Sequence, residues 1–299
     1  MSMKFDVILS NPPFQDMVRR GRTPHKLWIE FTERSLESWL KEDGVLAQVS
    51  PSSFRSPSNR ILSLMKRYCT AGINLDTNCF FPGVGSSFAH YVIDKARPGN
   101  CETTVVQDGR KFQIVLDDAV EYIPNTFSVE SFAIHRKVVF EPAQKLRVEW
   151  DYVTCHNILL KKSDSLSKIE TDKHVYPVFH TNRQTWFSSI QQDFARQPKV
   201  MWTRSGYTIP FYDDNRGCTD MAYFVRVENE EEGRNLAHNL NLKLMRYIYK
   251  TAKWSGFGNE LVFRSLPALP VDRQIDDQEL FDMFGLTREE IRHVTDNLG

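Results

Sequence analysis

The chain has 299 residues, of which 41% are hydrophobic and 25% charged, a composition that excludes disordered and collagen-like classes and leaves room for two domains. Lys and Arg together number 38, as do Asp and Glu, so a nucleic-acid binder of this composition needs a local basic face. No apolar run is long enough to cross a bilayer and no signal-peptide pattern opens the chain, so we expect a cytoplasmic protein without membrane contact.

The spacing of cysteines and histidines argues against disulfides and metal sites. No two cysteines are close in sequence, which suits a reducing compartment, and the eight histidines lack ligand spacing. We therefore expect no metal and no disulfide framework. The cysteines are Cys69, Cys79, Cys101, Cys155 and Cys218.

The first notable stretch runs from Phe5 to Phe14. Val7, Ile8 and Leu9 form an apolar run that predicts a buried strand of a parallel sheet. Pro12 and Pro13 then end the strand, because neither can donate a backbone hydrogen bond. The stretch predicts a rigid turn at the carboxyl end of a strand, where open α/β sheets bind ligands.

This turn has the groups needed to hold an amino group on a flat ring. The Asn11 side-chain oxygen and the Pro12 carbonyl are acceptors, and Phe14 can stack on the ring. The stretch resembles motif IV of the amino-group DNA methyltransferases, and its Asn-Pro-Pro-Phe form resembles the N6-adenine branch, TaqI-like enzymes included. The resemblance implies a target adenine flipped from the duplex and S-adenosylmethionine as cofactor, with Asn11 also contacting the cofactor. The residues that it marks as catalytic are Asn11, Pro12, Pro13 and Phe14.

The segments up to residue 70 alternate between strand and helix. A helix is predicted over 25–41, stopped by Asp43-Gly44, then a strand over 45–49 and a helix over 59–68. This order is typical of a parallel, doubly wound sheet.

Further strands are predicted over 72–81 and 87–95, followed by antiparallel runs at 103–106 and 112–116. The glycine-containing segment 81–86 reads as a hairpin turn and not as a nucleotide loop, because no helix follows it. The resemblance implies that Phe81 and Phe88 are walls of the target-base pocket; ordinary packing is the alternative for each.

The pattern changes after residue 124 and predicts three parts: 1–124, the catalytic half of a methyltransferase domain; 125–270, a target-recognition domain; and 271–299, a helical tail. Strands are predicted at 175–179 and 199–202, and a helix over 233–253. Residues 276–279 cap a short helix, and Thr287 to Glu290 form a capping box for the last one. The predicted fold class is α/β: an incomplete doubly wound, Rossmann-like methyltransferase sheet followed by an irregular α+β domain.

Cations and aromatic residues are interleaved between residues 183 and 216, where Arg and Lys can contact phosphates and amides can read bases. A solvated surface of mixed charge is the alternative. The interleaved residues are Arg183, Gln184, Trp186, Arg196, Lys199, Trp202, Arg204, Tyr207 and Arg216. The best candidates for backbone contact share one helix face by their spacing, and are Lys243, Arg246, Lys250 and Lys253.

The segments 254–259 and 266–270 resemble the end of the recognition domain in phage and type II-G restriction–modification adenine methyltransferases. In TaqI-like enzymes the glycine-rich cofactor loop precedes the Asn-Pro-Pro motif, whereas here ten residues precede Asn11. The glycine pair at 256 and 258 lacks a preceding strand and acid, so it does not replace that loop. The chain thus resembles the C-terminal part of such an enzyme, starting at its fourth motif.

These observations lead to a site-specific DNA adenine N6-methyltransferase subunit or fragment that acts on double-stranded DNA. Its cofactor half is supplied by another chain, or the chain is a truncated fragment, or it has lost catalysis. The expected partners are a separate cofactor-binding subunit or a second copy, because an edge strand at 5–9 would be adhesive. The alternative is an inactive, methyltransferase-like DNA-binding or antirestriction protein; methylation of RNA or of a protein glutamine is a third reading.

Overall fold

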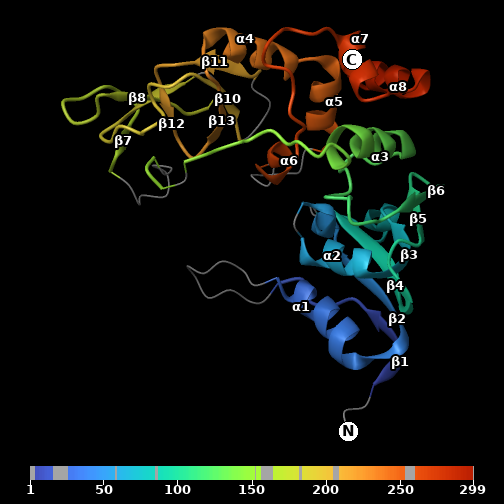
Figure 1. The fold of residues 1–299 in the computed structure, drawn as a ribbon. Helices are drawn as coiled ribbons and strands as arrows, with labels where there is room; N and C mark the ends of the chain where they lie inside the picture. Colours follow the sequence, from blue (N-terminus) through green and yellow to red (C-terminus); the bar gives the residue numbers. More distant parts are fainter. Residues whose placement is uncertain are drawn as a thin grey trace. The chain divides into compact units, whose positions relative to one another are not determined.

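Two units make up the chain, Met1–Arg136 and Lys137–Gly299. The computed structural model describes residues 4–15, 26–57, 59–84, 87–151, 153–155, 164–181, 184–204, 209–252 and 260–298. Figure 1 colours the first unit from blue to green and the second from green to red. The finer division at residues 124 and 270 stays a prediction about function.

A mixed sheet with the strand order β1-β2-β4-β3-β5-β6 forms the centre of the first unit. β1 and β2 are parallel, as are β3 and β5, and the remaining neighbours are antiparallel. The predicted α/β class is confirmed, with a mixed sheet in place of the parallel one expected from the segments up to residue 70. The strands are β1 (Phe5–Ser10), β2 (Leu40–Pro51), β3 (Tyr68–Asn74), β4 (Phe88–Pro98), β5 (Glu102–Gln107) and β6 (Arg110–Val115).

Helices lie on one face of this sheet, where the alternating side chains of β2 and β4 are buried. Thr32 in the first helix bonds the Tyr91 hydroxyl of β4 at 3.0 Å, and Leu46 and Ile93 on the same sheet face are fully buried. The helices of this face are α1 (Leu27–Arg34), the π-helical turn η1 (Ser35–Trp39) and α2 (Arg60–Arg67). The unit also contains η2 (Ser52–Arg55), η3 (Asp76–Phe80) and α3 (Val129–His135), and η4 (Arg136–Phe140) crosses the boundary to the second unit.

Two predicted segments in this unit need correction. The strand predicted over 72–81 lies earlier, at Tyr68–Asn74, and Asp76–Phe80 form a helical turn. The first helical segment does not continue to Asp43-Gly44, because β2 already begins at Leu40 and Gly44 lies inside that strand. The predicted start of this helix, residue 25, lies outside the described residues. The second helix starts as predicted, since the Asn59 side chain accepts a hydrogen bond from the Ile61 amide at 3.0 Å.

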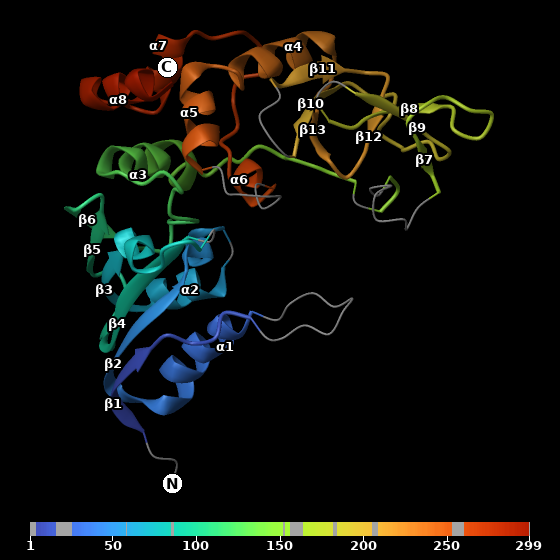
Figure 2. The same cartoon turned by 180° about the vertical axis from the view of Figure 1, so that it is seen from behind.

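β1 is parallel to β2, as predicted, but it is not buried. It lies at the edge of the sheet (Figures 1 and 2), with Val7 56% and Leu9 80% exposed. The apolar run therefore predicted the strand correctly and its burial wrongly, because burial depends on neighbours that the described residues do not supply.

The expectation of no disulfide is wrong for one pair. Cys69 at the start of β3 and Cys101 just before β5 form a disulfide, with their Cα atoms 5.4 Å apart. The two strands are parallel neighbours, which brings together cysteines separated by 32 positions in sequence. Sequence spacing alone could not reveal this pair, because the pairing follows from the strand order.

The second unit contains two small sheets and five helices in its described parts, which agrees with the predicted α+β class. One sheet has the order β12-β8-β9-β7 and the other β11-β10-β13. The strands are β7 (Leu166–Ser167), β8 (Tyr176–Phe179), β9 (Thr185–Ser188), β10 (Lys199–Thr203), β11 (Phe211–Asp213), β12 (Gly217–Cys218) and β13 (Ala222–Arg226). The helices are α4 (Glu230–Asn239), α5 (Lys243–Ala252), α6 (Glu260–Arg264), α7 (Asp277–Met283) and α8 (Arg288–Leu298).

The helix predicted over 233–253 is two helices, α4 and α5. The buried Asn239 side chain ends the first by bonding the 270–275 segment, with Ile275 N–H donating to its oxygen at 3.0 Å. The Asp277 carboxylate then accepts the Lys243 N–H at 2.8 Å and starts the second. The predicted capping box of the last helix is confirmed, with Thr287 N–H donating to Glu290 at 2.7 Å and Glu290 N–H donating to the Thr287 hydroxyl. Among the residues placed by the structure, no helix is long and apolar enough to cross a bilayer.

Candidate functional site

The Asn-Pro-Pro-Phe turn begins where β1 ends, at Ser10, which pairs with Gln48 of β2. Asn11 and Pro13 are exposed, Pro12 is buried and Phe14 is half-buried. The Asn11 side chain makes no hydrogen bond within the described part of the chain, so its oxygen is open to a ligand. The turn is therefore anchored through Pro12 and presents Asn11 outward.

Three aromatic residues from distant parts of the sequence meet at this turn. The ring of Phe14 stacks on that of Phe88, with centroids 5.1 Å apart and an interplanar angle of 30°. Phe81 contacts the same Phe88 ring at 4.7 Å. Phe88 is only 4% exposed and supports the other two. The structure thus places Phe81 and Phe88 beside the motif; their roles in base binding stay predictions.

The strand order explains why these rings meet. β1 and β2 are parallel and β4 is antiparallel to β2. The carboxyl ends of β1 and β2 and the start of β4 therefore lie at the same end of the sheet. Pro51 at the end of β2 pairs with Phe88 at the start of β4. The Asn78 side chain accepts the Phe88 N–H, which fixes the segment that contains Phe81.

A buried polar cluster lies behind the turn, and sequence reasoning missed it. Gln48 donates from Nε2 to the Thr32 hydroxyl at 2.6 Å and to the Tyr91 hydroxyl at 3.0 Å. Burial raises the pKa of Tyr91 well above its usual value, so this hydroxyl stays neutral. Because Gln48 pairs with Ser10, the cluster ties the end of β1 to α1 and β4. A glutamine inside an apolar strand is the sequence signal that marked it.

The cationic stripe on α5 is exposed, but two of its members already have partners. Lys243 pairs with Asp277 at 3.1 Å, and Lys250 donates to the Asn297 carbonyl at 2.5 Å. Arg246 is exposed, with no ion pair among the residues described by the structure, and Lys253 lies outside those residues. Among the described members of the stripe, Arg246 is the one most open to a phosphate.

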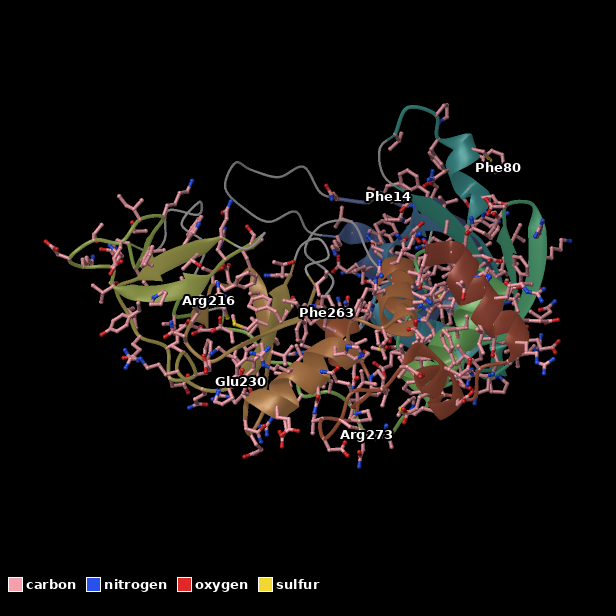
Figure 3. The ribbon with its side chains drawn as sticks, turned by 90° about the horizontal axis from the view of Figure 1, so that it is seen from above. Phe14, Phe80, Arg216, Glu230, Phe263 and Arg273 are labelled. Carbon is pink, nitrogen blue, oxygen red and sulfur yellow. A yellow bond between two sulfur atoms is a disulfide. The ribbon has the colours of Figure 1, made fainter. Side chains whose placement is uncertain are left out.

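Part of the interleaved stretch 183–216 is core and not surface. Trp186, Lys199 and Trp202 are buried, and burial lowers the pKa of Lys199 to about 8. Its Nζ donates to the carbonyls of Ala195 and Gln197, at 2.9 Å each, and so caps a turn. Arg216, labelled in Figure 3, is held by Asp213 at 2.6 Å. Arg196 and Gln184 are exposed, Arg204 is half-buried, and Arg183 and Tyr207 lie outside the described residues.

No protein-family model matches the chain, and no curated protein matches it. Several solved structures are similar in fold. The Type ISP restriction-modification enzyme LlaGI, solved as a nuclease-deletion mutant with a DNA substrate mimic, has a TM-score of 0.47 at 10% identity, over 88% of this chain and 40% of that one. The Type IIL restriction-modification enzyme MmeI, in complex with DNA, has a TM-score of 0.40 at 12% identity, over 88% and 46%.

The type IIG restriction endonuclease BpuSI has a TM-score of 0.32 at 11% identity, over 89% of this chain and 45% of that one. The chain spans less than half the length of these three proteins. Identities in this range describe likeness of fold and not of function.

Proposed function

We propose that this chain is the base-binding and DNA-binding part of a site-specific DNA adenine N6-methyltransferase, which works with a cofactor-binding half supplied from outside these 299 residues. The observation that carries the proposal is the meeting of an exposed, unbonded Asn11 with the stacked rings of Phe14 and Phe88 at one sheet edge. Acceptors beside a flat apolar surface suit an aromatic ring that carries an amino group.

The target adenine leaves the duplex and stacks on the outer face of Phe14, with Phe88 supporting that ring from behind. The Asn11 side-chain oxygen and the Pro12 carbonyl accept the two hydrogens of the N6 amine. This holds the nitrogen lone pair toward the donor, and the proton released on methylation passes to solvent. S-adenosylmethionine is the methyl donor in this chemistry, and Asn11 is the residue that we propose to contact it.

The described residues fit the methyl-accepting side of such a site but not a complete cofactor site. β1 has no strand on its outer side within the described residues, and Phe5, Val7 and Leu9 are exposed along it. The β1–β2 register places Val7 and Leu9 on the same sheet face as Val45 and Ala47, opposite the helices. Parallel strands are normally covered on both faces.

Both the outer edge of β1 and the sheet face opposite the helices are exposed, and this indicates the kind of partner. Two copies paired edge to edge would extend the sheet and leave its open face bare, whereas two copies stacked face to face would leave the edge unpaired. A partner with both a strand and helices covers the edge and the face together. We therefore assign the β1 edge to the cofactor-binding half, and a homodimer is the alternative.

DNA contact is proposed for the second unit, through Arg246 and, after release from their present partners, Lys243 and Lys250, together with Lys253. The sequence that follows Phe14 adds Arg19, Arg20 and Arg22 next to the motif. Phosphate contacts of this kind position a duplex without reading its sequence.

The test uses the isolated chain and two short duplexes that differ only in the partner of one adenine, a thymine or a mismatched cytosine. Because a mismatched adenine is easier to extrude, the wild type is expected to bind the mismatched duplex about tenfold more tightly. Asn11→Ala combined with Phe14→Ala should remove this preference, whereas the control Asn100→Ala should keep it. Retention of the preference in the double variant would contradict the assignment of the base pocket.

The second candidate is a catalytically inactive, methyltransferase-like DNA-binding or antirestriction protein, in which the exposed Asn11 and the Phe14–Phe88 stack hold a base without methyl transfer. Labelled methyl donor, DNA and the chain, with and without a candidate cofactor-binding half, distinguish the two. Methyl transfer that requires both chains and Asn11 supports the split enzyme. DNA binding without transfer in any combination supports the inactive protein.

A further inference from the structure

Phe80 is an exposed aromatic residue that directly precedes Phe81, one of the three rings of the candidate site. It is 72% exposed, and its neighbour Phe81 packs against Phe88, which in turn stacks with Phe14. Val84, 51% exposed, lies in the same connection between β3 and β4. Figure 3 labels Phe80 on η3 and Phe14 after β1. Aromatic rings are enriched at interfaces, so a large ring left in solvent beside a candidate binding site is available to contact a partner.

The segment that carries Phe80 is held by side-chain bonds on both sides. The Asp76 carboxylate accepts the N–H groups of Asp108 and Gly109, at 2.7 and 2.9 Å. The Thr77 hydroxyl bonds the Asn74 carbonyl at 2.9 Å and the His90 ring at 3.0 Å. Phe80 is therefore presented from a fixed support, which lowers the entropy cost of inserting it into a partner.

Charge near this support favours a nucleic acid over an apolar protein surface. The turn held by Asp76 leads directly into Arg110 and Lys111 of β6, both exposed and without an ion pair among the described residues. An apolar ring with cations nearby matches a duplex, which offers stacked bases inside and phosphates outside.

We propose that Phe80 is a wedge that enters the base stack of double-stranded DNA beside the extruded adenine. The proposal rests on the proposed function for the identity of the partner. Phe81 and Phe88 join the wedge to the base pocket, so insertion of Phe80 and capture of the adenine by Asn11 and Phe14 occur at neighbouring places on one support. Stacking of Phe80 on a base offsets part of the cost of opening the duplex.

The experiment compares the wild type with Phe80→Ala, Phe80→Trp and the control Val84→Ala, on the matched and mismatched duplexes. Binding to the matched duplex is expected to weaken about tenfold in Phe80→Ala. Binding to the mismatched duplex should weaken much less, because less free energy is needed to unpair a mismatched adenine. Phe80→Trp should restore matched binding, and Val84→Ala should leave both unchanged. Energy transfer between dyes at the duplex ends should report a kink that Phe80→Ala removes.

Loss of affinity that is equal on both duplexes, with an unchanged kink, would show that Phe80 only adds contact area and would overturn the wedge. Unchanged binding in Phe80→Ala would overturn it as well. A different pattern is expected if Asn11 and Phe14 do not bind the adenine. The double variant of these residues then keeps the wild-type preference for the mismatched duplex, whereas the kink still depends on Phe80. Since Phe80 is exposed, these variants are expected to fold normally.

Discussion

Phe14 and Phe88 stack with their ring centroids 5.1 Å apart, and they differ sharply in how far they are buried. Phe88 is 4% exposed at the start of β4, whereas Phe14 is half-buried and follows an exposed Asn11. One ring thus belongs to the core and the other to the surface of the candidate site. Substitution of Phe88 should therefore mainly lower the stability of the protein, whereas substitution of Phe14 should mainly weaken ligand binding.

Phe88→Ala is expected to lower the free energy of unfolding by about 3–5 kcal/mol, because it leaves a cavity beneath Phe14 and Phe81. Phe14→Ala is expected to cost about 1 kcal/mol, since Phe14 is only partly buried. Urea unfolding of both variants measures the two values, and binding of the mismatched duplex measures function. A Phe14→Ala variant as unstable as Phe88→Ala would place Phe14 in the core.

Local sequence signals predicted much of this fold. Three of these signals depend on residues only a few positions apart, and each marks a real element. They are the start of a helix at Asn59, the capping box at Thr287 and the apolar run at Val7–Leu9. Features that depend on strand order were not accessible in this way. The Cys69–Cys101 pair, the Gln48 cluster and the exposure of Phe80 all follow from which strands become neighbours. The meeting of Phe81 and Phe88 with Phe14 was anticipated from family resemblance and not from spacing.

Substitution of the exposed edge should change association without changing folding. Leu9→Lys is expected to alter the free energy of unfolding by less than about 0.5 kcal/mol, because Leu9 is 80% exposed. It should reduce concentration-dependent light scattering, since it places a charge on an unpaired edge. Ile169→Lys in the second unit, at an apolar residue that is 69% exposed, is the matched control and should leave scattering unchanged.

The same edge also distinguishes a homodimer from a heterologous partner. If two copies pair antiparallel about Val7, then Val7→Cys in a Cys79→Ser background would form an intermolecular disulfide, because Cα atoms directly opposite in such a pair are about 4.5–5.5 Å apart. We expect no such cross-link, since the edge is assigned to a cofactor-binding half. Efficient cross-linking would favour the homodimer.

Reduction of the Cys69–Cys101 disulfide should destabilise the first unit. The bond closes a loop between residues separated by 32 positions, for which chain entropy predicts a loss of about 3–4 kcal/mol on opening. Thermal unfolding with and without dithiothreitol measures the effect, and a Cys69→Ser/Cys101→Ser variant should match the reduced protein. A reduced wild type as stable as the oxidised form would show that the loop is fixed by the sheet alone.

Acid should destabilise the first unit through His135, which is fully buried and bonds the Tyr122 hydroxyl at 2.8 Å. Burial lowers the pKa of His135 to about 3, whereas an unfolded chain has a histidine pKa of about 6.5. The unfolded state therefore binds an extra proton between these values, so stability is full above pH 6.5 and falls as pH drops toward 3, by up to about 1.4 kcal/mol per unit.

His180 in the second unit, whose pKa burial lowers to about 4, acts in the same direction. Urea midpoints between pH 7 and 5, above the carboxylate range, isolate the histidines. His135→Gln should flatten the dependence of the first unit, and His180→Gln should leave it unchanged. A wild type whose midpoint stays constant down to pH 5 would show that His135 takes up its proton as readily in the folded protein as in the unfolded chain.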